Sequence, residues 1–261
     1  MNIGLWKDQV KHFLFLAACF GALFSTTVTA ALPDTIVKIK PSIVGVGSYN
    51  VLGRPQTHLK GTGFVVLDGT YIVTNQHVVS PIETLEKEEL VIFVGQGFNP
   101  DVYKVSVVAR DESRDIAILK HTGKKLPALR FSDTKVREGE TIAFTGYPIG
   151  AILGFYPVTH QGIVSSITPV AIPADNSKKL SASVLKRLKD PFMVYQLDAT
   201  AYPGNSGSPV FDMQSGAVIG VVNKVFVKES KEAVLEKPSG ITYVIPSVEI
   251  EAVLRDAGLM Q

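Results

Sequence analysis

The sequence Gly204-Asn205-Ser206-Gly207-Ser208-Pro209-Val210 places one serine, Ser206, between two glycines. Glycine allows a tight, exposed turn, which projects the serine hydroxyl and leaves the N–H groups of Gly204, Asn205 and Ser206 available as donors to an oxyanion. A serine hydroxyl is a weak nucleophile at neutral pH, so it needs a base and a group that orients the base. The stretch therefore predicts a nucleophilic serine, provided that the rest of the chain supplies both partners.

Two segments upstream of this serine supply the expected partners. His77 follows a strand-like run at residues 71–74, and a loop there would present its imidazole to a cleft. Asp115 stands directly before the apolar run at residues 116–119, which predicts a buried strand and a partly desolvated carboxylate. Such a carboxylate can hold the imidazole through its other nitrogen. Asp111 is the competing acid, and Asp115 is preferred because Asp111 lies in a charged turn.

The three predicted catalytic residues occur in the chain order His, Asp, Ser. Their contexts are Thr-Asn-Gln-His at 74–77, Asp-Ile-Ala-Ile-Leu at 115–119 and Gly-Asn-Ser-Gly at 204–207. In order and context the chain resembles the trypsin-like serine proteases, and among them the high-temperature-requirement (HtrA/Deg) branch, over about residues 33–257. The resemblance implies a serine endopeptidase that acts on proteins or peptides through a triad of His77, Asp115 and Ser206, with no cofactor.

Many short apolar runs and few helical segments predict an all-β fold. With 46% hydrophobic and 19% charged residues, the chain can bury a sizeable core. The resemblance implies two six-stranded antiparallel β-barrels of the chymotrypsin/trypsin type with short terminal helices. We expect one protease domain over residues 31–261, with barrel one at about 42–122, barrel two at about 140–246 and a C-terminal helix at about 247–257.

The resemblance also predicts which residues line the substrate pocket. They are Thr200, Ala201, Tyr202, Val221 and Val222. Trypsins carry an aspartate six positions before the nucleophile, where this chain has Thr200, and glutamyl endopeptidases carry a histidine on the following strand, which is apolar here. A lining of small and β-branched groups favours a small aliphatic residue, such as Val, Ala or Leu, on the acyl side of the cut.

The chain departs from the HtrA pattern in three places. It ends soon after the final helix begins, so we expect no PDZ domain, and the segment at 170–190 is longer than the usual connection. The pair Tyr202-Pro203 replaces a polar pair before the Gly-Asn-Ser motif, which puts the shape of the oxyanion loop in doubt. This last departure leaves open a second function, a non-catalytic peptide-binding or chaperone-like protein on the same fold.

Residues 1–30 have the pattern of a signal peptide. Lys7 and Lys11 precede an apolar run, and small residues at 28–30 suit cleavage after Ala30, which predicts a periplasmic or secreted protein. The alternative is a lipoprotein, because residues 16–19 resemble a lipobox and an acylated Cys19 would anchor the chain. Cys19 is the only cysteine of the sequence, so neither a disulfide framework nor a cysteine-ligated metal is expected.

Charge and histidine placement indicate few further partners. The formal net charge is only +2, which does not predict binding to nucleic acid. No histidine stands at metal-ligand spacing from an acidic cluster, so no metal site is expected. The segment from Ser177 to Leu188 reads as a basic amphipathic helix, which most simply packs on its own domain but leaves open a weak membrane or partner contact.

Overall fold

The computed structural model of this chain describes residues 32–148, 154–170, 191–223 and 240–261. The predicted signal segment with Cys19 and the basic segment from Ser177 to Leu188 lie outside these residues. Among the helices of the described ranges, none is both long enough and apolar enough to cross a membrane.

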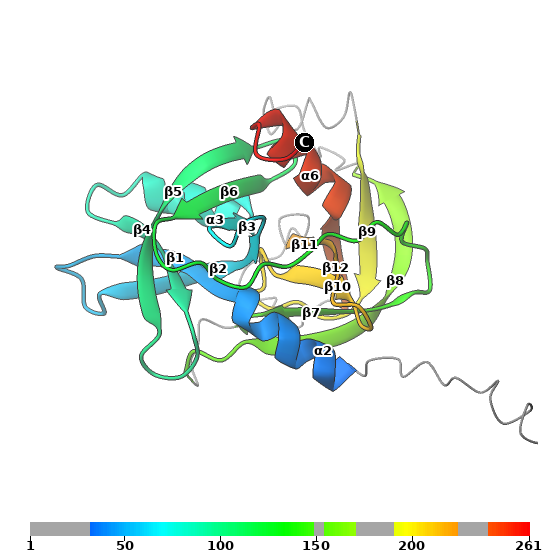
Figure 1. The fold of residues 1–261 in the computed structure, drawn as a ribbon, viewed down its shortest axis with the longest axis horizontal. Helices are drawn as coiled ribbons and strands as arrows, with labels where there is room; N and C mark the ends of the chain where they lie inside the picture. Colours follow the sequence, from blue (N-terminus) through cyan, green and yellow to red (C-terminus); the bar gives the residue numbers. More distant parts are fainter. Residues whose placement is uncertain (1–31, 149–153, 171–190, 224–239) are drawn as a thin grey trace, which may run out of the picture. The chain divides into compact units, whose positions relative to one another are not determined.

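The first six strands close into an antiparallel barrel, in the order β1-β2-β3-β6-β5-β4 (Figure 1). Their bounds are β1 Ile43–Tyr49, β2 Thr57–Val66, β3 Tyr71–Thr74, β4 Glu89–Val94, β5 Asp101–Asp111 and β6 Ile116–His121. The hairpin between β2 and β3 turns at Gly69, which has a φ of 89°, while Asp68 accepts hydrogen bonds from the Thr70 N–H and hydroxyl. Local turn chemistry therefore sets the register of the strand that leads to His77.

The last six strands close into a second antiparallel barrel, in the order β10-β11-β12-β9-β8-β7. Their bounds are β7 Thr141–Gly146, β8 Val158–Pro169, β9 Met193–Asp198, β10 Pro209–Asp212, β11 Val218–Asn223 and β12 Ile241–Pro246. Two closed six-stranded barrels with few short helices confirm the all-β class expected from the sequence.

In the described part of the chain, three short α-helices accompany the barrels: α2 Leu32–Ile39, α3 Gln76–Glu83 and α6 Ser247–Asp256. Helix α3 corrects one expectation, because His77 is its second residue and does not lie on a loop. The helix begins after Asn75, and its residues Val78, Val79 and Ile82 are buried on one side. Eight residues give too short a periodic pattern to distinguish this helix from a loop by sequence alone.

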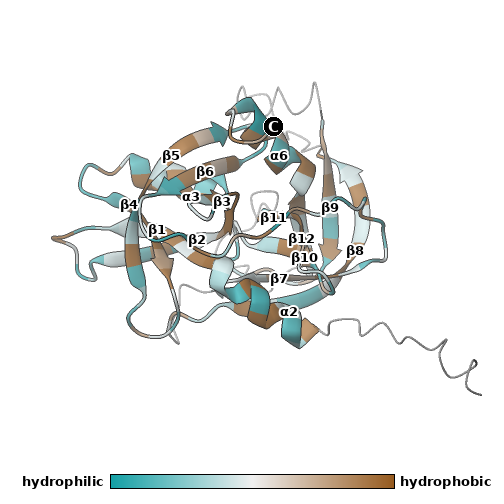
Figure 2. Cartoon of the chain, in the orientation of Figure 1, coloured by the Kyte–Doolittle hydropathy of each residue, from teal (hydrophilic) through white to brown (hydrophobic). Residues whose placement is uncertain are grey.

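The second half of strand β2 is buried on both of its faces. Successive side chains of β2 point to opposite sides, so Val65 packs with barrel-one strands and α3, while Phe64 and Val66 pack in a different core. This second cluster, here called the junction core, draws on both barrels and two helices. It includes Ile39, Ile43, Phe64, Val66, Ala143, Tyr147, Phe155, Phe211, Val221, Ile245, Ile250, Val253 and Leu254. Figure 2 shows that apolar residues gather mainly on the strands, while most connecting turns are polar.

Candidate active site

His77 and Asp115 are joined by a short hydrogen bond. His77 Nδ1 lies 2.6 Å from Asp115 Oδ2, and the His77 backbone N–H donates to Asp115 Oδ1 at 2.9 Å. Asp115 is 5% exposed, whereas the His77 side chain is 32% exposed. The carboxylate is thus buried and held by the first turn of α3, while the imidazole reaches solvent. The structure brings these two predicted residues together as the sequence interpretation required.

The backbone of Asp115 is held as firmly as its side chain. Its carbonyl oxygen accepts from Gln76 N at 3.2 Å and from Asn75 Nδ2 at 3.1 Å. Its φ is 54°, in the left-handed region that L-residues seldom adopt. Such a conformation costs on the order of 1–2 kcal/mol, so surrounding contacts must impose it.

Asn223, at the end of β11, is a site residue that the sequence interpretation missed. Its Nδ2 donates to Asp115 Oδ2 at 2.9 Å, so the acid of barrel one receives a hydrogen bond from barrel two. Asn223 is 1% exposed. The available signal was a single amide residue ending the apolar run at 218–222, but nothing local indicated which group it faces.

Ser206 lies in the second of two consecutive β-turns. Asn205 N donates to Tyr202 O at 3.0 Å across the first turn, and Ser208 N donates to Asn205 O at 3.0 Å across the second. The third residue of each turn is a glycine with positive φ, 101° at Gly204 and 87° at Gly207, as a type II turn requires. Among the described residues, the N–H groups of Gly204 and Ser206 donate to no protein acceptor.

Thr62 of β2 binds these turns to barrel one and was also missed from the sequence. Its N–H donates to Ser206 O at 2.8 Å, and its hydroxyl donates to Gly204 O at 2.7 Å. A Cβ at Gly207 would collide with the Thr62 carbonyl oxygen. A Cβ at Gly61 would lie 2.8 Å from Val78 Cγ2 and 3.0 Å from Ser206 O. The Ser206 turn therefore lies close against β2, next to the helix that carries the histidine.

The predicted pocket residues occupy two environments. Three of them are buried: Ala201 and Val222 lie in the core of barrel two, and Val221 lies in the junction core. Thr200 and Tyr202 are partly exposed before the turn.

His160 of β8 lies beside Tyr202, with ring centroids 5.9 Å apart, and stacks on Phe144 at 4.9 Å. Burial lowers the pKa of this histidine, so it is neutral at neutral pH.

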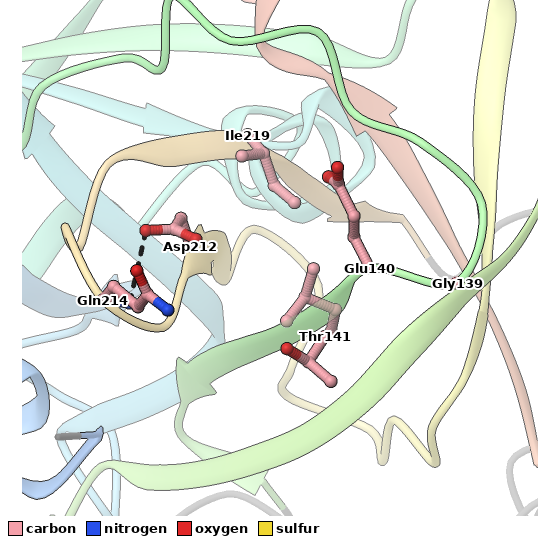
Figure 3. Close-up of a pocket in the computed structure, with 7 residues that line it drawn as sticks. Gly139, Glu140, Thr141, Asp212, Gln214 and Ile219 are labelled. Carbon is pink, nitrogen blue, oxygen red and sulfur yellow. Dashed lines mark hydrogen bonds between the residues drawn. The ribbon is translucent and has the colours of Figure 1, made fainter. Parts of the chain in front are cut away.

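Figure 3 shows a different, open pocket on barrel two. It is lined by Gly139, Glu140, Thr141, Ile142, Asp212, Gln214 and Ile219, and includes none of the predicted catalytic residues. Its two carboxylates have partners of their own, since Glu140 binds Arg137 and Asp212 accepts from Gln214 N and the Ser215 hydroxyl. Within the described ranges, no group of three or more His, Cys, Asp or Glu side chains could hold a metal ion.

Comparison with known proteins gives the family. Residues 61–221 match the family model of the trypsin-like peptidase domain. The chain belongs to the trypsin-like peptidases. The matched region contains His77, Asp115 and Ser206.

Curated relatives place this trypsin-like peptidase near the HtrA/Deg branch, as the sequence motifs indicated. It is 30% identical over 232 residues to the rat serine protease HTRA3, covering 86% of this chain and 44% of the relative. It is 30% identical over 169 residues to a probable periplasmic DegP-like serine endoprotease of Pseudomonas putida, covering 64% of this chain and 30% of the relative. The chain thus spans less than half the length of these relatives.

Solved structures support the fold of this trypsin-like peptidase. The active form of the Rv3671c protease from M. tuberculosis matches with a TM-score of 0.63 and 23% identity, over 87% of this chain and 85% of that one. The HtrA-type protease AlgW, solved with a tripeptide, matches with a TM-score of 0.62 and 20% identity, over 87% of this chain and 63% of that one.

Asp111, the competing acid, has a different environment from Asp115. Its Oδ1 accepts from the N–H groups of Ser113 and Arg114, at 2.7 and 3.0 Å, and its Oδ2 accepts from Arg114 Nη1 at 2.6 Å. Burial opposes the charged form, but the hydrogen bonds from Ser113 and Arg114 and the Arg114 charge outweigh it and lower the Asp111 pKa to about 2. The Asp111 carboxylate therefore stabilises the turn at residues 111–114, in which it lies.

We expect Asp111→Asn to lower the free energy of unfolding by about 2 kcal/mol at pH 7. The folded-state pKa of about 2 lies below the reference value of 3.8, so the ionised carboxylate stabilises the fold above about pH 4. That stabilisation is lost as the pH falls from about 4 through 2, and the two proteins should converge there. Urea unfolding between pH 2 and 7 measures the difference, with the exposed Asp133→Asn as control. If the difference in the free energy of unfolding did not change with pH, the effect would come from turn geometry and not from the carboxylate charge.

Proposed function

We propose that this chain is an exported serine endopeptidase in which Ser206 is the nucleophile, His77 the general base and Asp115 the group that orients the base. The observation that carries the proposal is the 2.6 Å contact between His77 Nδ1 and Asp115 Oδ2. An ionised carboxylate can only accept hydrogen bonds, so Nδ1 must carry the proton of the neutral imidazole. The free electron pair is then on Nε2, the nitrogen that a general base needs.

The reaction follows from these assignments. His77 Nε2 takes the Ser206 hydroxyl proton as Oγ attacks the scissile carbonyl, and the Asp115 carboxylate stabilises the imidazolium that forms. The tetrahedral oxyanion accepts hydrogen bonds from the N–H groups of Gly204 and Ser206, with Asn205 as the residue that joins them. The two type II turns support this role because they leave both donors without protein acceptors among the described residues.

Collapse of this intermediate releases the amine product, which receives the proton from His77, and leaves Ser206 acylated. Water then attacks the ester with the same histidine as base, and the acid product leaves. His77, Asp115 and Ser206, with the Gly204 N–H, supply these steps. The proposed substrates are proteins or peptides, as the DegP-like and HTRA3 names of the relatives indicate for those proteins.

We expect Ser206→Ala and His77→Ala each to reduce turnover of casein by about 10⁴- to 10⁶-fold, without multiplying in the double variant, because the two groups act as a unit. A fluorophosphonate probe should label the wild type and Ser215→Ala, an exposed control, but not Ser206→Ala. Labelling requires an activated serine. A folded wild type that neither cleaves nor labels would favour the alternative of a non-catalytic peptide-binding or chaperone-like protein.

We expect this peptidase to cut mainly after Val, Ala, Leu or Thr. The predicted pocket residues carry no charge, and the neighbouring His160 is neutral at neutral pH because burial lowers its pKa. Among these residues, neither a basic nor an acidic substrate side chain therefore finds a charged partner. A methylene group in such a pocket changes binding by only about 1–3 kcal/mol, so the preference should be broad. Mass spectrometry of casein digests tests this, and predominant cleavage after Arg, Lys or Glu would contradict it.

We also propose export to the periplasm or the exterior, with cleavage of the signal peptide after Ala30. The basic and apolar pattern of residues 1–30 supports this, together with the periplasmic relatives. N-terminal sequencing of the mature protein should begin at Ala31, and Cys19→Ser should leave its location unchanged. Recovery of a lipid-modified chain that begins at Cys19 would establish the lipoprotein alternative.

A further inference from the structure

Helix α6 lies over the junction of the two barrels (Figure 1). It contacts β11 and β12 of barrel two and β5 and β6 of barrel one. Its residues Ile250, Val253 and Leu254 are buried in the junction core, which fixes the helix against both barrels. Glu249 stands in the first turn of α6, so packing of the helix determines where this carboxylate lies.

Glu249 forms an ion pair with Arg114, the residue directly before Asp115. Arg114 Nε donates to Glu249 Oε2 at 2.6 Å, and Arg114 Nη1 donates to Asp111 Oδ2 at 2.6 Å. The side chains of Arg114 and Glu249 are only 27% and 17% exposed. A pair that is largely shielded from water is screened less by salt than a pair on the surface. The guanidinium thus connects α6 to the turn at residues 111–114.

This turn ends at the strained backbone of Asp115, with its φ of 54°. The segment from Asn75 to His77 holds the carbonyl and the carboxylate of Asp115 itself. The residue before Asp115, Arg114, is held as well: its N–H donates to Asp111 Oδ1, and its guanidinium binds both Asp111 and Glu249. The left-handed conformation is therefore held between two sets of contacts, one of which reaches the C-terminal helix.

We propose that Glu249 and Arg114 are positioning residues of the site: their ion pair holds Asp115 in the conformation that directs its carboxylate at His77. This inference rests on the proposed function, in which Asp115 orients His77. It adds that a helix from the C-terminal end of the chain contributes to the geometry of the triad. Both residues act through Asp115 and not on the substrate.

An arginine suits this position better than a lysine. The planar guanidinium donates along two edges at once and so binds two carboxylates in fixed directions. A lysine ammonium is a point charge on a flexible stem, and it would not hold the two carboxylates in the same geometry. Arg114→Lys therefore preserves the charge but removes the bridge between α6 and the turn.

The hydrogen-bonded proton on His77 Nδ1 gives a readout that needs no turnover. In the Ser206→Ala background, we expect a far-downfield proton signal from this short hydrogen bond. It should weaken or move upfield in Glu249→Ala, recover in part in Glu249→Gln, which keeps an acceptor oxygen, and stay unchanged in Glu251→Ala. Glu251 is the matched control, because it lies on the same helix and pairs with Arg255 at 3.3 Å.

In the active enzyme, Glu249→Ala should lower kcat by about 10- to 100-fold with little change in KM, the scale on which misplacement of a catalytic group acts. General destabilisation would reduce the amount of active protein but would leave the Nδ1 proton signal of the folded protein unchanged. Thermal unfolding confirms that each variant is folded at the assay temperature.

Each outcome decides between the two proposals. An Nδ1 proton signal that is the same in Glu249→Ala and Glu251→Ala would overturn the positioning inference, even if the enzyme is active. Absence of the signal in the parent protein would overturn it as well, since the hydrogen bond would not exist as described. If Glu249→Ala does not fold, Arg114→Lys gives the same test. An inactive wild type whose signal responds to Glu249→Ala would overturn the proposed function and leave the positioning intact.

Discussion

The structure of the candidate site depends on satisfying one buried carboxylate. Asp115 receives hydrogen bonds from His77 on helix α3 and from Asn223 on β11, so its partners come from both barrels. A buried anion without donors is strongly unfavourable, and this one has three close donors to its two oxygens. If either barrel moved away, the Asp115 carboxylate would lose at least one of these hydrogen bonds. The acid of the site and the association of the barrels therefore stabilise each other.

The junction core provides the apolar counterpart of this polar contact. Phe64 of barrel one and Phe211 of barrel two are fully buried in it, together with Ile250 of α6. A second link runs through Phe155, which exchanges backbone hydrogen bonds with Gly97 at 2.9 and 3.0 Å and stacks on Tyr147 at 4.0 Å. The sequence has one cysteine and so cannot form a disulfide within the chain. Apolar burial in the junction core, the Gly97–Phe155 backbone hydrogen bonds and the Asp115–Asn223 contact therefore hold the two barrels together.

The sequence predicted those parts of the structure that have local chemical signatures. Two glycines around Ser206 and an acid before an apolar run were sufficient to predict the tight turn at Ser206 and the contact of Asp115, and not Asp111, with His77. The roles of Asn223 and Thr62 could not be predicted in this way, because each is defined by a partner more than a hundred residues away in the chain. The helical state of His77 was missed for a different reason, since burial of Val78 and Val79 against the barrel stabilises a helix that is marginal by itself.

The same geometry explains why the Ser206 turn needs its second glycine for two independent reasons. Gly207 has a φ of 87°, which a side chain would strain, and a Cβ there would also collide with the Thr62 carbonyl oxygen. That oxygen is itself fixed, because it accepts from the Thr74 hydroxyl at 2.7 Å just before the segment that carries His77. Thr62 therefore contacts both halves of the site: it binds the Ser206 turn through its N–H and hydroxyl, and β3, the strand before helix α3, through its carbonyl. Close packing around Thr62 therefore limits how near the Ser206 turn can come to helix α3.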